Sequence, residues 1–203
     1  METYSYKTVK EAVTSEYREK GSKFLGYAQA VIDLEEAKFF VDEIKEMHPK
    51  ATHHCYAYRL GFEKDKNYRA NDDGEPSGTA GRPILGQIDS HGLTNVMVIV
   101  VRYYGGTKLG VPGLIRSYKT TAKEALANAE IVEHILKNKY LLRFEYPLMN
   151  EVMRKVKRNK VKILNQGYTD KCEMNISMAK QGSEAIISDL QKLRMLEIKP
   201  LID

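Results

Sequence analysis

The sequence of 203 residues lacks tryptophan, has two cysteines and six prolines, and contains no long apolar run. Cys55 and Cys172 lie far apart and neither belongs to a Cys-x-x-Cys pair, which argues against a disulfide framework or a zinc knuckle. No stretch approaches the roughly 18 apolar residues of a membrane-spanning helix, and residues 1–10 are polar with no signal-peptide segment behind them. We therefore expect a cytoplasmic protein that does not enter a membrane.

The remaining composition is that of a globular protein, with 42% hydrophobic and 29% charged residues and a net charge of +5. Residues 130–203 hold 14 Lys and Arg against 10 Asp and Glu, whereas residues 1–129 hold 18 against 17. The positive excess in the C-terminal half favours an anionic partner there. Nothing in the sequence indicates specificity for DNA.

Apolar spacing in the first half predicts strands alternating with helices. Residues 16–33 are predicted to form a hairpin around residues 20–22, and a capping box at Asp33 and Glu36 starts a helix that Pro49 ends. Residues 53–60 alternate as a strand. The polar, glycine-rich residues 61–81 are too long for a routine connection, which is typical of a functional or disordered loop. Residues 96–104 predict a strand buried on both faces at the centre of the sheet, and a helix begins near Pro112.

The second half predicts a different arrangement. Strands at residues 140–146, 161–168, 171–179 and 196–201 alternate with apolar helical stripes at residues 148–156 and 186–193. The order βαββαβ is that of a ferredoxin-like domain. We therefore predict an α+β protein with two domains, residues 1–136 and residues 137–203, that meet near Lys137.

Three segments carry a family resemblance: Ala-Thr-His-His-Cys-Tyr-Ala at residues 51–57, Asp-Asp-Gly-Glu-Pro-Ser-Gly-Thr-Ala-Gly-Arg-Pro at 72–83, and Val-Arg-Tyr-Tyr-Gly-Gly-Thr-Lys-Leu-Gly at 101–110. They resemble the signature of the IMPACT family, whose bacterial members include the YigZ-type proteins. The signature residues are Asp72, Asp73, Gly74, Glu75, Pro76, Ser77, Gly78, Gly105, Gly106 and Gly110. His54 departs from the pattern, because the family typically has asparagine there.

The resemblance implies an N-terminal α/β domain like the second domain of ribosomal protein S5, followed by a small ferredoxin-like domain. It also implies an association with translation, which the eukaryotic relatives regulate, and a possible protein partner in that process. The bacterial relatives are suspected of binding nucleic acid or the ribosome.

Three motifs contain residue types that can carry chemistry. The turn Gly105–Gly110 has the glycine spacing of a phosphate loop, but Val111 and Pro112 stand where Lys and Ser or Thr are required. It is either a tight turn or a phosphate contact, and we predict no nucleotide cofactor. The carboxylates in residues 72–75 either hold Mg²⁺ or form turns, and we expect turns and no metal. Residues 53–55 (His-His-Cys) are interpreted as ordinary strand residues.

Two groups of basic residues on predicted helices favour binding of RNA or the ribosome through phosphate neutralisation. They are Arg154, Lys155 and Arg158 on one helical face, and Arg116, Lys119 and Lys123 on another. The alternative is an enzyme in which residues 72–82 and the turn Gly105–Gly110 flank one cleft, where Arg82, Arg102 and Lys108 bind a small acidic or phosphorylated substrate. No catalytic residue is assigned, and a protein-interaction module is a third possibility.

Overall fold

The computed structural model describes residues 4–61, 67–168 and 170–201. It divides into two compact units, Tyr6–His134 and Ile135–Asp203 together with Met1–Ser5. Within the described residues, none of the helices combines the length and the apolar content that crossing a bilayer requires. Two strands, β1 (Ser5–Val9) and β7 (Ile131–Ile135), pair as a separate two-stranded sheet.

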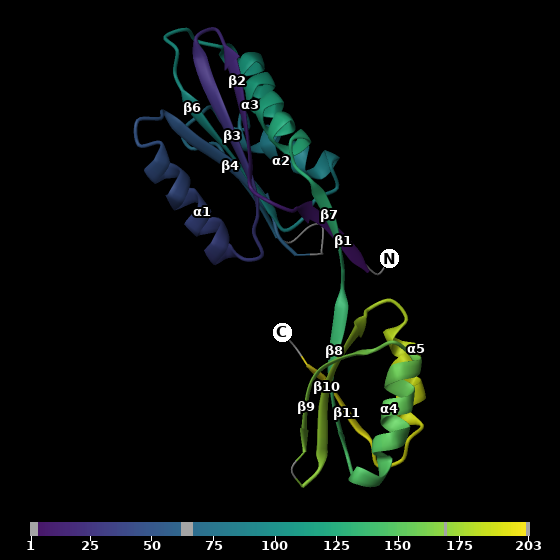
Figure 1. The fold of residues 1–203 in the computed structure, drawn as a ribbon. Helices are drawn as coiled ribbons and strands as arrows, with labels where there is room; N and C mark the ends of the chain where they lie inside the picture. The colour runs from purple at the N-terminus through teal and green to yellow at the C-terminus, as the bar shows by residue number, and fades with distance from the viewer. Residues whose placement is uncertain (1–3, 62–66, 169, 202–203) are drawn as a thin grey trace. The chain divides into compact units, whose positions relative to one another are not determined.

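The N-terminal unit is built on a five-stranded sheet in which all neighbouring strands are antiparallel (Figure 1). In their order across the sheet, the strands are β2 (Val13–Glu19), β3 (Ser22–Ala30), β6 (Val96–Tyr103), β4 (His53–Arg59) and β5 (Tyr68–Asn71). The hairpin between β2 and β3 is confirmed. Lys20 and Gly21 both have positive φ in its turn, as a two-residue hairpin loop of matching twist requires.

Three layers result, with α1 (Leu34–Met47) on one face of the sheet and α2 (Gly81–Ser90) and α3 (Gly110–Ala127) on the other (Figure 1). The central strand β6 confirms the prediction of burial on both faces. Val96, Val98 and Val100 pack towards α2 and α3, while the alternating Met97, Ile99 and Val101 pack towards α1. The predicted start of α1 is confirmed as well, because the Asp33 side chain accepts a hydrogen bond from the Glu36 N–H at 2.8 Å.

The interpretation of residues 61–81 as one polar loop was wrong. Strand β5 lies within it and pairs with β4, from Tyr56↔Asn71 to Arg59↔Tyr68. It carries no apolar alternation because it is a short edge strand whose side chains are exposed or only partly buried, so its pairing is decided by β4. Helix α2, which begins at the end of this segment, was not predicted either. Residues 62–66 lie outside the described residues.

The C-terminal unit has the predicted ferredoxin-like order and topology. Its elements are β8 (Lys137–Phe144), a short 3-10 helix η1 (Tyr146–Leu148), α4 (Met149–Arg158), β9 (Lys162–Tyr168), β10 (Cys172–Ala179), α5 (Ser183–Gln191) and β11 (Glu197–Leu201). The antiparallel sheet runs β11-β8-β10-β9, and both helices cover one face (Figure 1). Met174 and Ile176 on β10 are fully buried under these helices, as the alternation predicted. The α+β fold class is therefore confirmed.

Candidate functional site

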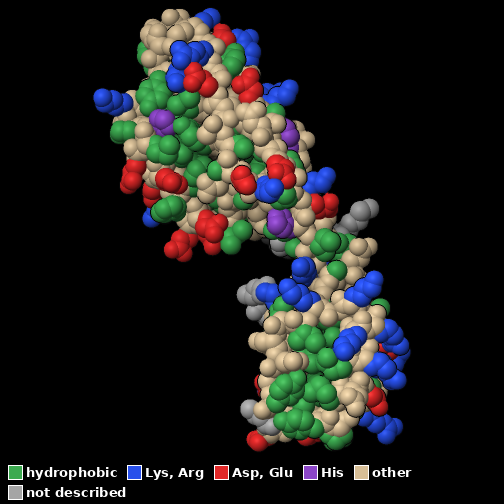
Figure 2. Space-filling view, in the orientation of Figure 1, with side chains coloured by type: hydrophobic (Ala, Val, Ile, Leu, Met, Phe, Trp, Pro, Cys, Tyr) green, Lys and Arg blue, Asp and Glu red, His purple; other side chains and the backbone are tan. Residues whose placement is uncertain are grey.

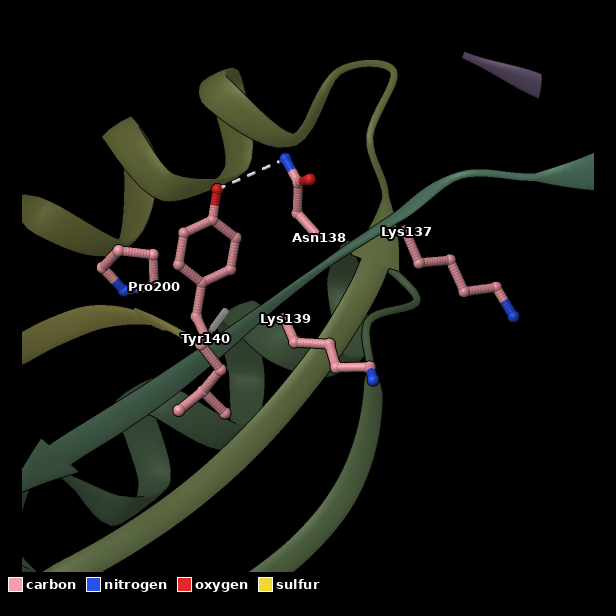
Figure 3. A pocket seen from close by; sticks show the side chains of 6 residues that line it. Lys137, Asn138, Lys139, Tyr140 and Pro200 are labelled. Carbon is pink, nitrogen blue, oxygen red and sulfur yellow. Dashed lines mark hydrogen bonds between the residues drawn. The ribbon is translucent and has the colours of Figure 1, made fainter. Parts of the chain in front are cut away.

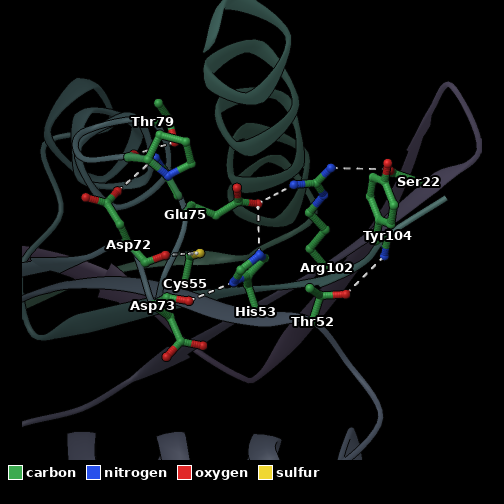
Figure 4. A network of polar contacts seen from close by, with 12 residues as sticks. Ser22, Thr52, His53, Cys55, Asp72, Asp73, Glu75, Thr79, Arg102 and Tyr104 are labelled. Atoms are coloured by element: carbon green, nitrogen blue, oxygen red, sulfur yellow. Dashed lines mark hydrogen bonds and ion pairs between the residues drawn. The ribbon is translucent and has the colours of Figure 1, made fainter. Parts of the chain in front are cut away.

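The three signature segments meet at one end of β4 and β6, and Asp72 organises the loop between them (Figure 4). Its carboxylate accepts hydrogen bonds from the backbone N–H groups of Gly78 at 2.8 Å, Ala80 at 3.0 Å and Gly81 at 2.8 Å. Burial opposes ionisation of Asp72, but these three donors outweigh it and lower the pKa of the carboxyl. Asp72 thus holds the start of α2 as a capping residue would, which supports the turn-forming interpretation.

The neighbouring Asp73 fixes both histidines of β4. Its backbone has positive φ, and its carbonyl oxygen lies 2.7 Å from Nδ1 of His53. Because a carbonyl only accepts, Nδ1 of His53 carries the proton and Nε2 faces Glu75, 3.8 Å from Oε1. The Asp73 carboxylate accepts from the backbone N–H of His54 at 2.6 Å. The His54 side chain itself is turned to the His48 carbonyl, and burial lowers the pKa of its imidazole.

Glu75 lies at the centre of the network, with 3% of its side chain exposed (Figure 4). One carboxylate oxygen, Oε1, accepts from Arg102 Nη1 at 2.5 Å and from the Tyr118 hydroxyl at 2.8 Å. The loop is thereby tied to β6 and to α3. A buried carboxylate needs partners of this kind, since an isolated charge in the interior is strongly disfavoured.

Arg102 is buried on the other side of this pair, with 7% of its side chain exposed. Its guanidinium lies between the rings of Phe24 and Tyr104, 5.5 Å from each centroid, and Nη2 reaches the Ser22 hydroxyl at 3.5 Å. Its Nε has no hydrogen-bond partner among the described residues. The only arginine of the central strand is therefore engaged inside the protein.

The glycine turn after β6 packs against the β2–β3 hairpin. A Cβ atom on Gly105 would lie 1.9 Å from the carbonyl carbon of Gly21, and the Gly105 N–H donates to the Ser22 hydroxyl at 3.2 Å. Gly106 and Gly110 have positive φ of 84° and 70°. Gly105 is therefore required by the close approach of the Gly21 backbone, and Gly106 and Gly110 by their positive φ. Both observations favour the tight-turn interpretation of Gly105–Gly110.

Cys55 and Tyr118 close the network beneath Glu75. The Cys55 thiol donates to the Asp72 carbonyl at 3.0 Å and lies 3.3 Å from the Tyr118 hydroxyl. Burial raises the pKa of the Cys55 thiol. Burial also raises the pKa of the Tyr118 hydroxyl, and the nearby Cys55 and Glu75 raise it further. Both groups stay protonated at neutral pH, so Cys55 is not an activated nucleophile. Among the residues described, no cluster of three or more His, Cys, Asp or Glu side chains is placed to hold a metal ion.

The predicted anion-binding residues of the N-terminal unit divide into two groups. Arg102 is buried against Glu75, whereas the others have exposed side chains: Arg82, Lys108, Arg116, Lys119 and Lys123. Arg116 lies 3.6 Å from the Glu19 carboxylate. Ser22 and Tyr118 complete the network, but no sequence pattern connects them with the signature, since one lies in a hairpin and the other in a helical apolar stripe.

On α4 the structure corrects the predicted basic face. Lys155 does not project into solvent with Arg154 and Arg158, because Nζ contacts both the carboxylate and the backbone carbonyl of Asp189 on α5, at 2.8 and 2.9 Å. Arg158 reaches the same carboxylate at 2.6 Å but remains 65% exposed. The helical period places Lys157, rather than Lys155, on the solvent face beside Arg154.

A cavity of about 250 Å³ lies in the C-terminal unit between the first residues of β8 and the end of β11 (Figure 3). It is lined by Lys137, Asn138, Lys139, Tyr140, Pro200 and Leu201. Asn138 and Tyr140 point towards α5, while the two lysines extend from the opposite face of the strand (Figure 3). Its polar groups therefore do not converge on one ligand.

These features define a class of protein with an antiparallel three-layered unit, closed by a buried ion pair between two signature segments, and a ferredoxin-like unit. The Impact N-terminal domain matches residues 20–126, more than half of the chain. An IMPACT family member of Haemophilus influenzae is 35% identical over 91% of this chain and 90% of its own length. The IMPACT family member YvyE of Bacillus subtilis is 35% identical over 90% and 83%. The chain therefore belongs to the IMPACT family, and the resemblance expected from the three segments is confirmed.

A solved structure, described as "Crystal structure of an hypothetical protein", is similar over the full length. It is 28% identical to this chain, covers 99% of both chains and superposes with a TM-score of 0.73. The likeness extends over both units.

Proposed function

We propose that this chain is a translation-associated protein of the cytoplasm that binds RNA or the ribosome through exposed basic side chains. Membership of the IMPACT family, which the sequence resemblance links to translation, supports the association with translation. The distribution of charge supports the kind of partner. Because phosphate neutralisation requires accessible cations, the accessible basic residues decide where such contact takes place.

The observation that carries the proposal is the segregation of charge between the units. Residues 135–203 together with residues 1–5 hold 14 Lys and Arg against nine Asp and Glu, a net charge of +5, whereas residues 6–134 hold 18 of each. The entire positive excess therefore belongs to the C-terminal unit. A field of one sign on a small unit attracts polyanions at long range and weakens as salt increases.

Helix α4 presents this charge to solvent. Arg154, Lys157 and Arg158 are exposed on one face, and Lys160 follows in the turn. The opposite face carries Val152 and Val156, which are fully buried. The basic face is thus fixed by packing of the helix. The exposed Arg116, Lys119 and Lys123 on α3 offer a second and less charged surface in the N-terminal unit.

The alternative of an enzyme acting on a small anionic substrate is less well supported. It required Arg102 to bind the substrate, but the guanidinium is buried and paired with Glu75. A new anion would have to displace this carboxylate from a site with 7% exposure of the arginine side chain. Arg82 and Lys108 remain exposed, and they do not by themselves make a substrate site.

The test compares the wild-type chain with Arg154→Glu/Lys157→Glu. We expect weaker co-sedimentation with ribosomes and weaker binding to ribosomal RNA, with the salt slope reduced by roughly one for each phosphate that is no longer neutralised. Neither side chain contacts a carboxylate among the described residues, so no ion pair is lost, and two glutamates near the end of α4 should lower the melting temperature only slightly. Lys155 is left intact because it stabilises the packing of α4 against α5.

The matched control is Lys7→Glu/Lys50→Glu, which makes the same change of charge at exposed positions of the N-terminal unit. It should bind RNA nearly as wild type does. Equal weakening by both double variants would mean that only total charge matters, and the proposed face would be abandoned. Unchanged binding by the α4 variant would do the same, and would direct attention to α3.

A further inference from the structure

The outer face of α1 exposes a phenylalanine surrounded by carboxylates. Phe39 is 69% exposed, although the described Phe24, Phe40 and Phe144 are buried. The residues three and four positions away from it on either side are the neighbours of Phe39 on the helix surface, and all four are acidic. They are Glu35, Glu36, Asp42 and Glu43.

The apolar character continues along the same ridge of the helix. Residues at i, i+4 spacing lie in one row, and here the row is Glu35, Phe39, Glu43, Met47. Met47 is 58% exposed. The solvent face of α1 therefore alternates acidic and apolar side chains, and acidic side chains gather over this helix in the space-filling view (Figure 2). Single exposed apolar residues are ordinary, but an aromatic residue set within four carboxylates is not explained by packing.

The acidic residues also act against the stability of the helix that carries them. Asp42 and Glu46 are like charges at i, i+4, and Glu43 and Glu46 at i, i+3, so they repel each other. Glu43 and Glu46 lie in the last turns of α1, where the helix dipole disfavours negative charge. None of Glu35, Asp42, Glu43 and Glu46 forms an ion pair within the described part of the chain. A positive partner would relieve this repulsion.

We propose that the outer face of α1, formed by Phe39 and Met47 with Glu35, Asp42, Glu43 and Glu46, is the docking surface for a basic protein segment. An arginine-rich segment matches this surface because its side chains can both stack on an aromatic ring and pair with carboxylates. A guanidinium stacks on the Phe39 ring and pairs with Glu35 or Glu43, and the aliphatic stems of the basic side chains cover Met47. Exposed aromatic side chains are frequent anchors in such interfaces.

Charge excludes the competing occupants. RNA is repelled, because the five carboxylates of α1 outnumber its two lysines, Lys38 and Lys45, and neither lysine lies on the Glu35–Met47 row. The surface is thus independent of the basic face on α4, and one chain can hold RNA with its C-terminal unit and a basic protein with its N-terminal unit.

The first experiment measures binding of a fluorescein-labelled amphipathic helical peptide of Arg, Leu and Ala residues to the full chain by fluorescence anisotropy. Phe39→Ala and, separately, Glu35→Gln/Glu43→Gln should each weaken binding about tenfold. The control Met195→Ala removes an apolar side chain that is 81% exposed in the C-terminal unit, and should leave the affinity unchanged. Absence of binding to the wild type, or equal affinity of Phe39→Ala and wild type, overturns the proposal.

The second experiment places the photo-crosslinker benzoylphenylalanine at position 39 in cells. The expected product is a crosslink to a basic protein that disappears when Glu35→Gln/Glu43→Gln is added. A product removed by ribonuclease, a crosslink between two copies of this chain, or a product that persists with the glutamine substitutions overturns the proposal. Because α4 is unchanged throughout, failure here leaves the RNA-binding proposal standing, and the α4 variants test that proposal separately.

Discussion

Glu75 and Arg102, which lie in two different signature segments, form a buried ion pair with 2.5 Å between Oε1 and Nη1. The pair joins the loop that precedes α2 to the end of the central strand β6, and the Tyr118 hydroxyl adds α3 to the same oxygen. A residue of the signature loop and a residue predicted to bind an anion are therefore partners of each other. Their contact holds the exposed Pro76 and Ser77 in a fixed place on the surface.

The first prediction concerns this pair. Glu75→Gln leaves the Arg102 charge buried without a counter-charge and should lower the free energy of unfolding by about 3–5 kcal/mol. Because the chain has no tryptophan, urea unfolding is followed by far-UV circular dichroism. The double variant Glu75→Gln/Arg102→Met removes both charges and should be less destabilised than the sum of the two single variants. Strict additivity would show that the two side chains are not coupled.

The second prediction compares two glycines. Gly105→Ala places a Cβ against the Gly21 backbone and should destabilise the protein by several kcal/mol or prevent folding, because neither backbone can move freely. Gly86→Ala is the matched control, since Gly86 lies on the exposed side of α2 with open space around it. Alanine there should stabilise the helix by about 0.5–1 kcal/mol. Thermal melting distinguishes the two, and similar effects of both substitutions would contradict the close approach of the two turns.

The third prediction concerns pH. The folded pKa of Asp72 is lowered, so its ionised form favours the folded state. Its contribution is fully present above the ordinary value of 3.8 and is lost as pH falls through the lower folded value. Asp72→Asn should reduce stability by about 1 kcal/mol at neutral pH, as loss of a helix cap does.

The measurement for Asp72 is the melting temperature of both proteins from about pH 6 down to about pH 2. The difference between wild type and Asp72→Asn should shrink as the pH falls, because protonation makes the wild-type side chain neutral too. A constant difference across this range would mean that the hydrogen bonds to Gly78, Ala80 and Gly81 do not depend on ionisation of the carboxyl.

The sequence by itself determined the helices and strands whose apolar residues recur with a regular period or in an unbroken run. The unbroken apolar run at residues 96–104 required burial on both faces, and the period-two pattern of β10 with the stripes of α4 and α5 was sufficient for the ferredoxin-like order. The signature segments were sufficient for the family. Patterns of this kind can be interpreted from the sequence because the period of a helix or strand fixes which side chains face the core, whichever residues they contact there.

The tertiary structure alone decided which charged residues are paired inside the protein and which remain exposed. The sequence indicates Arg102 and Lys155 as anion-binding residues, yet each pairs with a carboxylate distant in sequence, 27 residues away at Glu75 for the first and 34 residues away at Asp189 for the second. Strand β5 likewise depends on β4 for its pairing. A charged side chain pairs with an opposite charge that the fold brings near, and that partner can lie far away in the sequence. Phe39 is the opposite case, an apolar side chain that the fold leaves exposed. Its helix buries the adjacent Phe40 instead, so the Phe39 ring lies in solvent.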